Sequence, residues 1–230
     1  LKAAVNAGPD LIVVIAGDGT ARAAVEAAGP DGPMIAPLPG GTMNMLPKAI
    51  YGQLAWPEAL KAILERGEAR TIGGGAVDGR TFLVAAILGA PALWAPAREA
   101  MRDGKPRLAL LRAQRALRRA FTGRLRYTLG DGPREKAEAL TFMCPLTSRA
   151  LDDDDQALEA AALDLADAGQ AFRLGVQALV GDWRDDPNVV VDRVLVTIVT
   201  VDHAMVVAVA VKDAVKTSTT VVLLKKRFLR

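Results

Sequence analysis

A glycine-rich turn with one carboxylate, Gly17-Asp18-Gly19-Thr20, is the first group of residues in this chain that could do chemistry. It follows the Val- and Ile-rich run at residues 10–16, which predicts a buried parallel strand, and precedes an Ala-rich predicted helix at residues 20–28. Backbone N–H groups in such a turn can approach a phosphate, and open α/β sheets bind ligands at the carboxyl ends of their strands. The turn therefore indicates a phosphate site, although many strand–turn–helix units use Gly-Asp-Gly only to make the turn.

A second polar turn follows the next predicted strand. Residues 34–39 predict that strand, and Gly40-Gly41-Thr42-Met43-Asn44 separates it from a predicted helix at residues 45–50. The Thr42 hydroxyl and the Asn44 amide can donate hydrogen bonds to a phosphate or a sugar without adding charge. Each motif alone can be explained by the need for glycine in a tight turn. Two such turns after successive strands, however, can line one crevice. Together they favour nucleotide binding.

These two segments resemble the catalytic domain of the diacylglycerol kinase-like lipid kinases, a family that includes bacterial lipid kinases and the sphingosine and ceramide kinases. The family carries a Gly-Gly-Asp-Gly-Thr turn and a Pro-x-Gly-Thr-x-Asn turn at its ATP site. Residues 13–20 and 37–44 match these turns, apart from Ala16 at the first glycine and one extra residue in the second turn. NAD kinases and phosphofructokinases share the Gly-Asp-Gly turn, but the second turn argues against both.

The resemblance implies an ATP-dependent lipid kinase that transfers the γ-phosphoryl group to a hydroxyl of a diacylglycerol-like or sphingoid lipid. Its fold would be an α/β nucleotide-binding lobe, like that of phosphofructokinases and NAD kinases, followed by a larger and mainly β-sandwich lipid-substrate lobe, with the active site in the cleft. The lobes would be residues 1–70 and 71–230. ATP and Mg²⁺ would be the cofactors. The residues that match the nucleotide-binding turns are Gly17, Asp18, Gly19, Thr20, Gly41, Thr42 and Asn44.

Phosphoryl transfer also needs a carboxylate that accepts the proton of the attacking hydroxyl. We expect Asp18 to organise the metal or to act as this base, and to contribute little to the core because it lies in a turn. The family has an Asp-Gly-Glu triplet late in the chain, where this sequence has Asp202-His203-Ala204. By this resemblance Asp202 is a candidate catalytic residue, but the glutamate is absent. The alternative is therefore a catalytically impaired relative that still binds nucleotide or lipid.

Four adjacent aspartates at residues 152–155 form the most acidic run of the chain. An exposed acidic loop is the plain interpretation, because adjacent carboxylates repel one another unless water or a cation screens them. The resembled family often has an Asp-Asp-Gly-x-Leu stretch near a structural Mg²⁺, and residues 154–158 are similar but lack the glycine. The resemblance makes Asp154 and Asp155 candidate metal ligands.

Further patterns predict the elements that would position these residues. A helix is expected at residues 56–66, between Pro57 near its start and Gly67 past its end. The glycine cluster at residues 73–75 suggests a crossing between lobes, and residues 77–83 predict a hairpin with an Asp-Gly turn. β-branched and apolar runs predict strands at residues 125–129, 139–144, 189–200, 205–211 and 217–224. A further helix is predicted at residues 164–180.

Residues 106–123 predict a basic helix rich in Ala, Leu and Arg. Two interpretations stay open for it. In the first, Leu108, Leu111, Ala116 and Phe121 cover an apolar side that packs on the core, and the arginines form a solvated face. In the second, the arginines attach the protein to anionic lipid headgroups, each adding about 1 kcal/mol near a membrane surface. The basic residues of this stretch are Arg107, Arg112, Arg115, Arg118 and Arg119.

Composition limits what the protein can be. With 230 residues, 51% of them hydrophobic and 24% charged, the chain is globular and can form one large domain or two small ones. A net charge of +3 predicts no nucleic-acid partner. The single Cys144 excludes an internal disulfide and is interpreted as a buried structural thiol.

The sequence also indicates where in the cell the protein acts and how much of the resembled domain it contains. No apolar run approaches the roughly twenty residues of a membrane helix, and the start resembles no signal peptide. We expect a cytoplasmic protein that associates peripherally with an anionic membrane surface to meet its lipid substrate; homodimer formation stays open. Members of the resembled family carry a further strand and helices before the point that matches Leu1, so we expect this chain to lack the family's amino-terminal segment.

Overall fold

The structure is a computed structural model of the 230-residue chain. It describes residues 1–77, 80–89, 100, 104–112, 125–129, 132–148, 150–152, 157–163, 189–194, 196–201, 204–210 and 219–223. The chain divides into two compact units. One contains Leu1–Ala85, Met143–Leu158 and Val209–Arg230, and the other contains Ala86–Phe142 and Glu159–Ala208.

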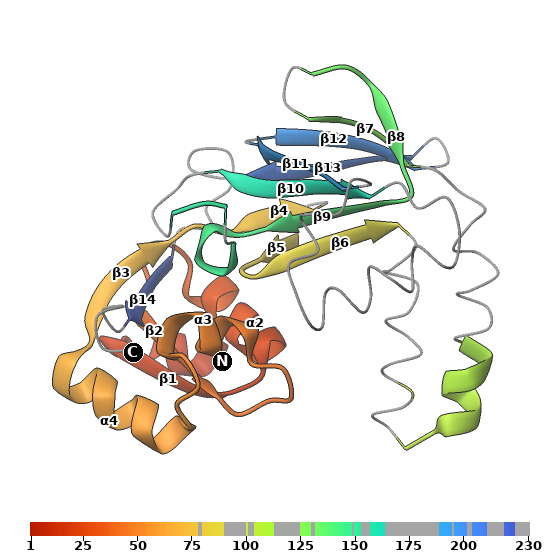
Figure 1. Cartoon of the computed structure of the whole chain (residues 1–230). Helices are drawn as coiled ribbons and strands as arrows, with labels where there is room; N and C mark the ends of the chain where they lie inside the picture. Colours follow the sequence, from red (N-terminus) through yellow and green to blue (C-terminus); the bar gives the residue numbers. More distant parts are fainter. Residues whose placement is uncertain are drawn as a thin grey trace. The chain divides into compact units, whose positions relative to one another are not determined.

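The first unit is built on a four-stranded sheet with the strand order β1-β2-β14-β3 (Figure 1). β1 (Leu11–Ala16) and β2 (Met34–Pro39) are parallel, with Leu11 opposite Met34 and Ala16 opposite Pro39. β14 (Thr219–Leu223) is parallel to β2 and antiparallel to β3 (Glu68–Ile72). A strand from the far end of the sequence thus lies between two strands from its first third.

Helices precede and follow the strands of this sheet. They are α1 (Lys2–Asn6), α2 (Asp18–Ala28), α3 (Met45–Tyr51) and α4 (Trp56–Arg66). α2 and α3 end at Gly29 and Gly52, whose positive φ angles of 69° and 68° favour glycine. The predicted strands at 10–16 and 34–39 and the predicted helices at 20–28, 45–50 and 56–66 are confirmed to within a few residues. The buried core of the unit includes Val14, Val25, Ile35, Leu38, Leu46, Ile50, Tyr51 and Ile63.

The described residues after the first sheet are mainly β. β4 (Gly75–Val77) and β5 (Arg80–Phe82) pair antiparallel as the predicted hairpin. Two further sheets have the orders β11-β10-β9-β6 and β5-β4-β13-β12-β7-β8. The remaining elements are β6 (Ala85–Gly89), β7 (Leu125–Leu129), β8 (Glu135–Ala137), β9 (Ala139–Met143), the short 3₁₀ helix η2 (Pro145–Thr147), β10 (Leu158–Leu163), β11 (Val189–Val194), β12 (Val196–Val201) and β13 (Ala204–Ala210). A β-rich second part agrees with expectation, while its packing as a sandwich stays a prediction.

The predicted boundary between the two lobes follows residue 70, whereas each compact unit combines segments from distant parts of the chain. Residues 71–85 and 143–158 cluster with the first unit, and β14 pairs with both of its neighbours there. The β-branched residues of the 217–224 segment predicted a strand, but such a pattern does not specify which sheet the strand joins.

Part of the remaining expectations lies outside the described residues. Residues 106–112 of the predicted basic helix are helical, whereas residues 113–123 and the predicted helix at 164–180 are not described. Within the described part of the chain, none of the helices has the length and apolar character needed to cross a membrane.

Candidate functional site

The two glycine-rich turns lie together at one edge of the first sheet. Because β1 and β2 are adjacent and parallel, their carboxyl ends are side by side, with Ala16 opposite Pro39. Gly17 follows β1 directly and Gly40 follows β2 directly. The Gly40 N–H donates a hydrogen bond of 3.1 Å to the Ala16 carbonyl, which extends the pairing into the turns. The parallel arrangement thus brings together the turns that the sequence analysis singled out.

Glycine is required at Gly41 because the two turns pack backbone against backbone. A Cβ atom on Gly41 would lie 2.4 Å from the Cα of Gly17 and 2.9 Å from its nitrogen. A Cβ on Gly40 would lie 2.7 Å from the nitrogen of Ala16. Any side chain at either position would force the turns apart.

Asp18 joins the first turn to the helix that follows the second. Its Oδ2 accepts the N–H of Met45 at 3.0 Å, and its Oδ1 accepts the N–H of Leu46 at 2.8 Å. These are the first two amides of α3, which have no partner inside the helix. Asp18 therefore caps α3 from a distant part of the sequence. This corrects our expectation that the carboxylate contributes little to the fold.

Asn44 closes the second turn on itself. Its Oδ1 accepts the Gly41 N–H and its Nδ2 donates to the Gly41 carbonyl, both at 2.7 Å. Its backbone is left-handed, with φ of 52° and ψ of 43°, a conformation that Asn tolerates better than most residues. As the N-cap of α3 it makes no side-chain cap bond, and Asp18 supplies that bond instead.

The surface that the turns present to solvent is rich in backbone and hydroxyl groups. Gly19, Thr20, Gly41 and Thr42 are exposed. α2 begins at Asp18 without a side-chain cap bond, so the positive end of its dipole lies at this surface. A Cβ atom on Gly19 would meet nothing within 4 Å, so packing within the described residues does not require glycine there.

Several predicted site residues lie outside the described residues. These are the candidate base Asp202 and the candidate metal ligands Asp154 and Asp155. Asp152, at the start of the same acidic run, is exposed. In the described ranges there is no group of three or more His, Cys, Asp or Glu residues that could hold a metal ion. The base and the metal ligands therefore stay predictions.

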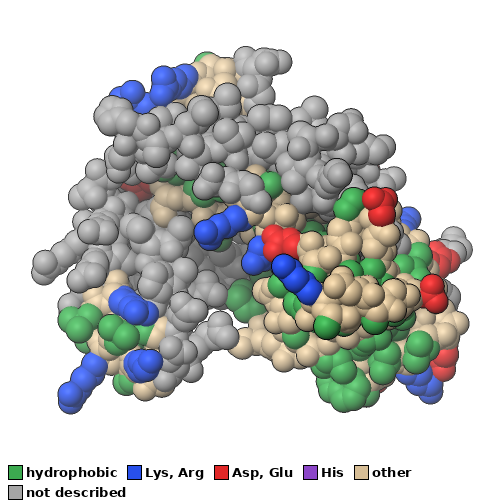
Figure 2. All heavy atoms as spheres, turned by 180° about the vertical axis from the view of Figure 1, so that it is seen from behind, with side chains coloured by type: hydrophobic (Ala, Val, Ile, Leu, Met, Phe, Trp, Pro, Cys, Tyr) green, Lys and Arg blue, Asp and Glu red, His purple; other side chains and the backbone are tan. Residues whose placement is uncertain are grey.

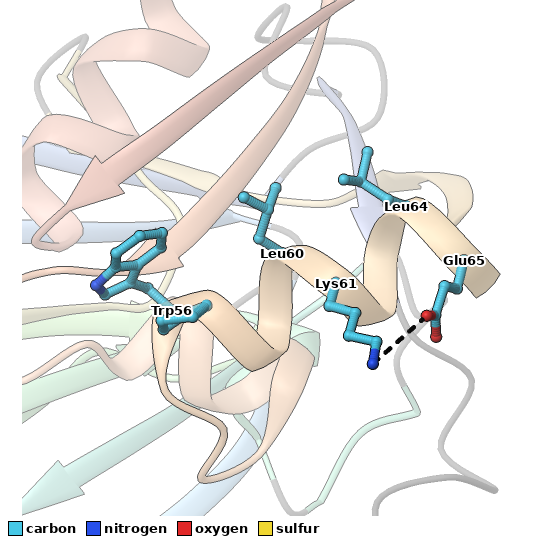
Figure 3. Close-up of a pocket in the computed structure, with 6 residues that line it drawn as sticks. Trp56, Leu60, Lys61, Leu64 and Glu65 are labelled. Carbon is cyan, nitrogen blue, oxygen red and sulfur yellow. Dashed lines mark ion pairs between the residues drawn. The ribbon is translucent and has the colours of Figure 1, made fainter.

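A separate hollow of about 420 Å³ lies along α4 and contains none of the predicted site residues (Figure 3). Trp56, Leu60 and Leu64 follow one another along the helix, and Lys61 pairs with Glu65 at 4.0 Å. Pro57 completes its lining.

Cys144 is a buried structural thiol, as expected. Burial raises its pKa to about 12, with a smaller opposing effect from a backbone hydrogen bond at Gly75. Its Sγ lies 3.6 Å from the Phe82 carbonyl, and its N–H donates to the Val84 carbonyl at 2.9 Å. The thiol therefore stays protonated and links the end of β9 to the hairpin segment.

Comparisons with known proteins bear on the same part of the chain. Residues 1–77 match the family model of the diacylglycerol kinase catalytic domain. No curated protein matches the sequence.

Solved structures extend the comparison to most of the chain. Two solved structures of a proposed diacylglycerol kinase from the Sterne strain of Bacillus anthracis are similar, with TM-scores of 0.67 and 0.68 at 18% identity. They cover 93% and 95% of this chain and 78% and 79% of their own. A structure of a diacylglycerol kinase from the same strain has a TM-score of 0.63 at 15% identity, covering 93% of this chain and 76% of its own. At these identities the similarity shows a shared fold.

Proposed function

Because residues 1–77 match the family model of the diacylglycerol kinase catalytic domain, we propose that this chain is an ATP-dependent lipid kinase. It transfers the γ-phosphoryl group of ATP to a hydroxyl of a diacylglycerol-like or sphingoid lipid. The observation that carries the proposal is the meeting of two exposed glycine-rich turns at the carboxyl ends of β1 and β2. In open α/β sheets this is where ligands bind.

The first turn has the features of a phosphate cradle. Glycine in a helix is less stable than alanine by roughly 0.5–1 kcal/mol, yet Gly19 stands in the first turn of α2 with free space around it. A ligand that approaches the backbone at Gly19 explains this choice, since a methyl group would occupy that space. The uncapped start of α2 favours an anion there, and the exposed hydroxyls of Thr20 and Thr42 can donate hydrogen bonds to it.

Asp18 would serve this site chiefly by holding its shape. Its bonds to Met45 and Leu46 keep the second turn against the first. Each carboxylate oxygen has further acceptor capacity, which suits a divalent cation. Mg²⁺ would neutralise the charge of the transferred phosphoryl group when it is bound with ATP.

A second candidate function keeps the nucleotide site without the transfer reaction. Ala204, the first residue of β13, stands where the resembled family has its glutamate, and a methyl group accepts no proton. A catalytically impaired relative that binds nucleotide or lipid is the alternative, unless Asp202 or Asp18 serves as the base.

Transfer of labelled phosphate from ATP distinguishes these functions. The chain would be incubated with ATP labelled at the γ-phosphate and Mg²⁺, with diacylglycerol, sphingosine or ceramide in mixed micelles. The proposal predicts a labelled lipid from at least one alcohol, which also identifies the substrate. ATP binding without labelled lipid would support the impaired relative. Absence of both would contradict a nucleotide-dependent function altogether.

A further inference from the structure

We propose that residues 104–112 dock the protein onto an anionic lipid bilayer by inserting exposed leucines between basic side chains. This inference rests on the proposed function only in that a lipid kinase must reach a membrane. The docking itself can be measured without any phosphoryl transfer.

Two of the three leucines of this segment are largely exposed, and the third, Leu108, is 37% exposed. Residues 106–112 are helical, and Leu110 and Leu111 are 61% and 63% exposed, whereas Ala109 is only 3% exposed. At 100° per residue, Leu110, Leu111 and Arg107 lie on the side of the helix away from Ala109. Of the residues that the core-packing interpretation places on the apolar side, Leu111 is 63% exposed and Leu108 is 37% exposed, while Ala116 and Phe121 lie outside the described residues.

In the sequence, the charged residues from 104 to 130 are all basic, and Asp103 and Asp131 flank the stretch. Residues 104–130 contain no Asp or Glu, in a chain whose whole net charge is only +3. Figure 2 shows hydrophobic and basic side chains gathered on the 104–112 segment at the lower left, with no acidic ones among them. The basic residues of the 104–130 stretch are Lys105, Arg107, Arg112, Arg115, Arg118, Arg119, Arg124 and Arg126.

A bilayer fits this combination better than a nucleic acid does. Exposed leucines gain from an apolar phase, and basic residues beside them are attracted to anionic headgroups. Single-stranded nucleic acids are bound by exposed aromatic side chains on which bases stack. Residues 104–112 contain none, and of the two aromatic residues in the 104–130 stretch, Phe121 and Tyr127, the latter is buried. Basic charge would attract both a nucleic acid and an anionic bilayer. The exposed leucines favour the bilayer, because only the bilayer offers an apolar phase.

α4 provides a matched control within the same chain. Leu64 is 70% exposed, but Lys61 beside it pairs with Glu65, so the surface has mixed charge. An exposed leucine in this setting lacks the electrostatic attraction that the proposal requires.

Vesicle sedimentation tests the proposal. The 230-residue chain would be mixed with vesicles of phosphatidylcholine alone or of phosphatidylcholine with phosphatidylglycerol, at low and high salt. We expect binding to the anionic vesicles, weaker binding at high salt because surface charges are screened, and little binding to phosphatidylcholine alone. Equal binding to both vesicles, or to neither, would overturn the proposal.

Variants then assign the binding to this segment. Arg107→Gln should weaken binding to anionic vesicles about fivefold. The double variant Leu110→Ser/Leu111→Ser should weaken it about tenfold or more. Leu64→Ser and Lys61→Gln on α4 should leave it unchanged. If the α4 variants have the same effect as the 104–112 variants, the proposed surface is wrong.

Two outcomes separate this inference from the proposed function. Vesicle binding that depends on Leu110 and Leu111, without any labelled lipid product, would retain the docking surface and contradict the kinase. Labelled product in detergent micelles, with no binding to anionic vesicles, would retain the kinase and overturn the docking surface. Tighter binding to a single-stranded RNA homopolymer than to vesicles would also overturn it.

Discussion

At the scale of single residues, Asp18 is a structural link as well as a candidate site residue. Replacing it by Ala removes both acceptors from the first amides of α3, and we expect the free energy of unfolding to fall by about 1–2 kcal/mol. Asp18→Asn keeps one acceptor oxygen and should lose less. Urea denaturation measures both values. Asp31→Ala, in the exposed turn after α2, is the control and should change stability by no more than about 0.5 kcal/mol. Equal losses at both positions would contradict the capping role.

Two glycines of the same turns should respond in opposite ways to an added methyl group. Gly41→Ala forces a Cβ to 2.4 Å from the Gly17 Cα, so we expect a loss of about 1–3 kcal/mol in thermal or urea unfolding. Gly19→Ala meets no atom within 4 Å and lies in a helix, so it should leave stability unchanged or raise it by up to about 1 kcal/mol. A destabilised Gly19→Ala variant would show that the first turn is packed more tightly than described.

Buried acids make the fold sensitive to alkali. Burial raises the pKa of the Cys144 thiol from its ordinary value of 9.0 to about 12, so the unfolded chain loses this proton at lower pH than the folded chain does. The stabilisation is complete below about pH 9 and falls as the pH rises toward about 12. Burial raises the pKa of Tyr51 in the same sense. Cys144→Ala should therefore reduce, but not abolish, the loss of stability between neutral and alkaline urea titrations. An unchanged slope would contradict the buried thiol.

At the scale of elements, the sequence predicted β1, β2, α2, α3 and α4 to within two residues, from apolar runs, an Ala-rich segment and Gly67 past the end of α4. It did not predict the strands β3, β6, β8 and β10. The position of β14 between β2 and β3 was missed, because its pattern indicates a strand and not its neighbours. Within the candidate site the two turns were predicted from their glycines. The bond from Asp18 to α3 was not, because 27 residues separate Asp18 from Met45.

The pairing of β14 gives a prediction at this scale. Val221 lies opposite Ile35 of β2 and opposite Arg70 of β3, so Val221→Pro removes an amide from the middle of the sheet. We expect β3 amides to exchange with solvent much faster in this variant, while the β1–β2 pairing keeps its protection. Hydrogen exchange measures both strands in one experiment. Unchanged protection of β3 would mean that β14 is not its partner.

At the scale of the whole molecule, the fold is inferred from similarity to solved structures, whereas the nucleotide site is inferred from the family match and the two glycine-rich turns. Similarity to the Bacillus anthracis structures covers at least 93% of the chain and shows the fold. The family match is confined to residues 1–77, where both glycine-rich turns lie. The kinase proposal therefore depends on what these turns bind.

The most direct measurement is the affinity of the purified chain for ATP with Mg²⁺, by calorimetry, beside Gly19→Ala. The account predicts that the wild-type chain binds ATP and that the variant, with its stability intact, binds at least about tenfold more weakly because its methyl group occupies the phosphate position. A wild-type chain that does not bind ATP, or a variant that binds it equally well, would contradict the claim that these turns hold the nucleotide.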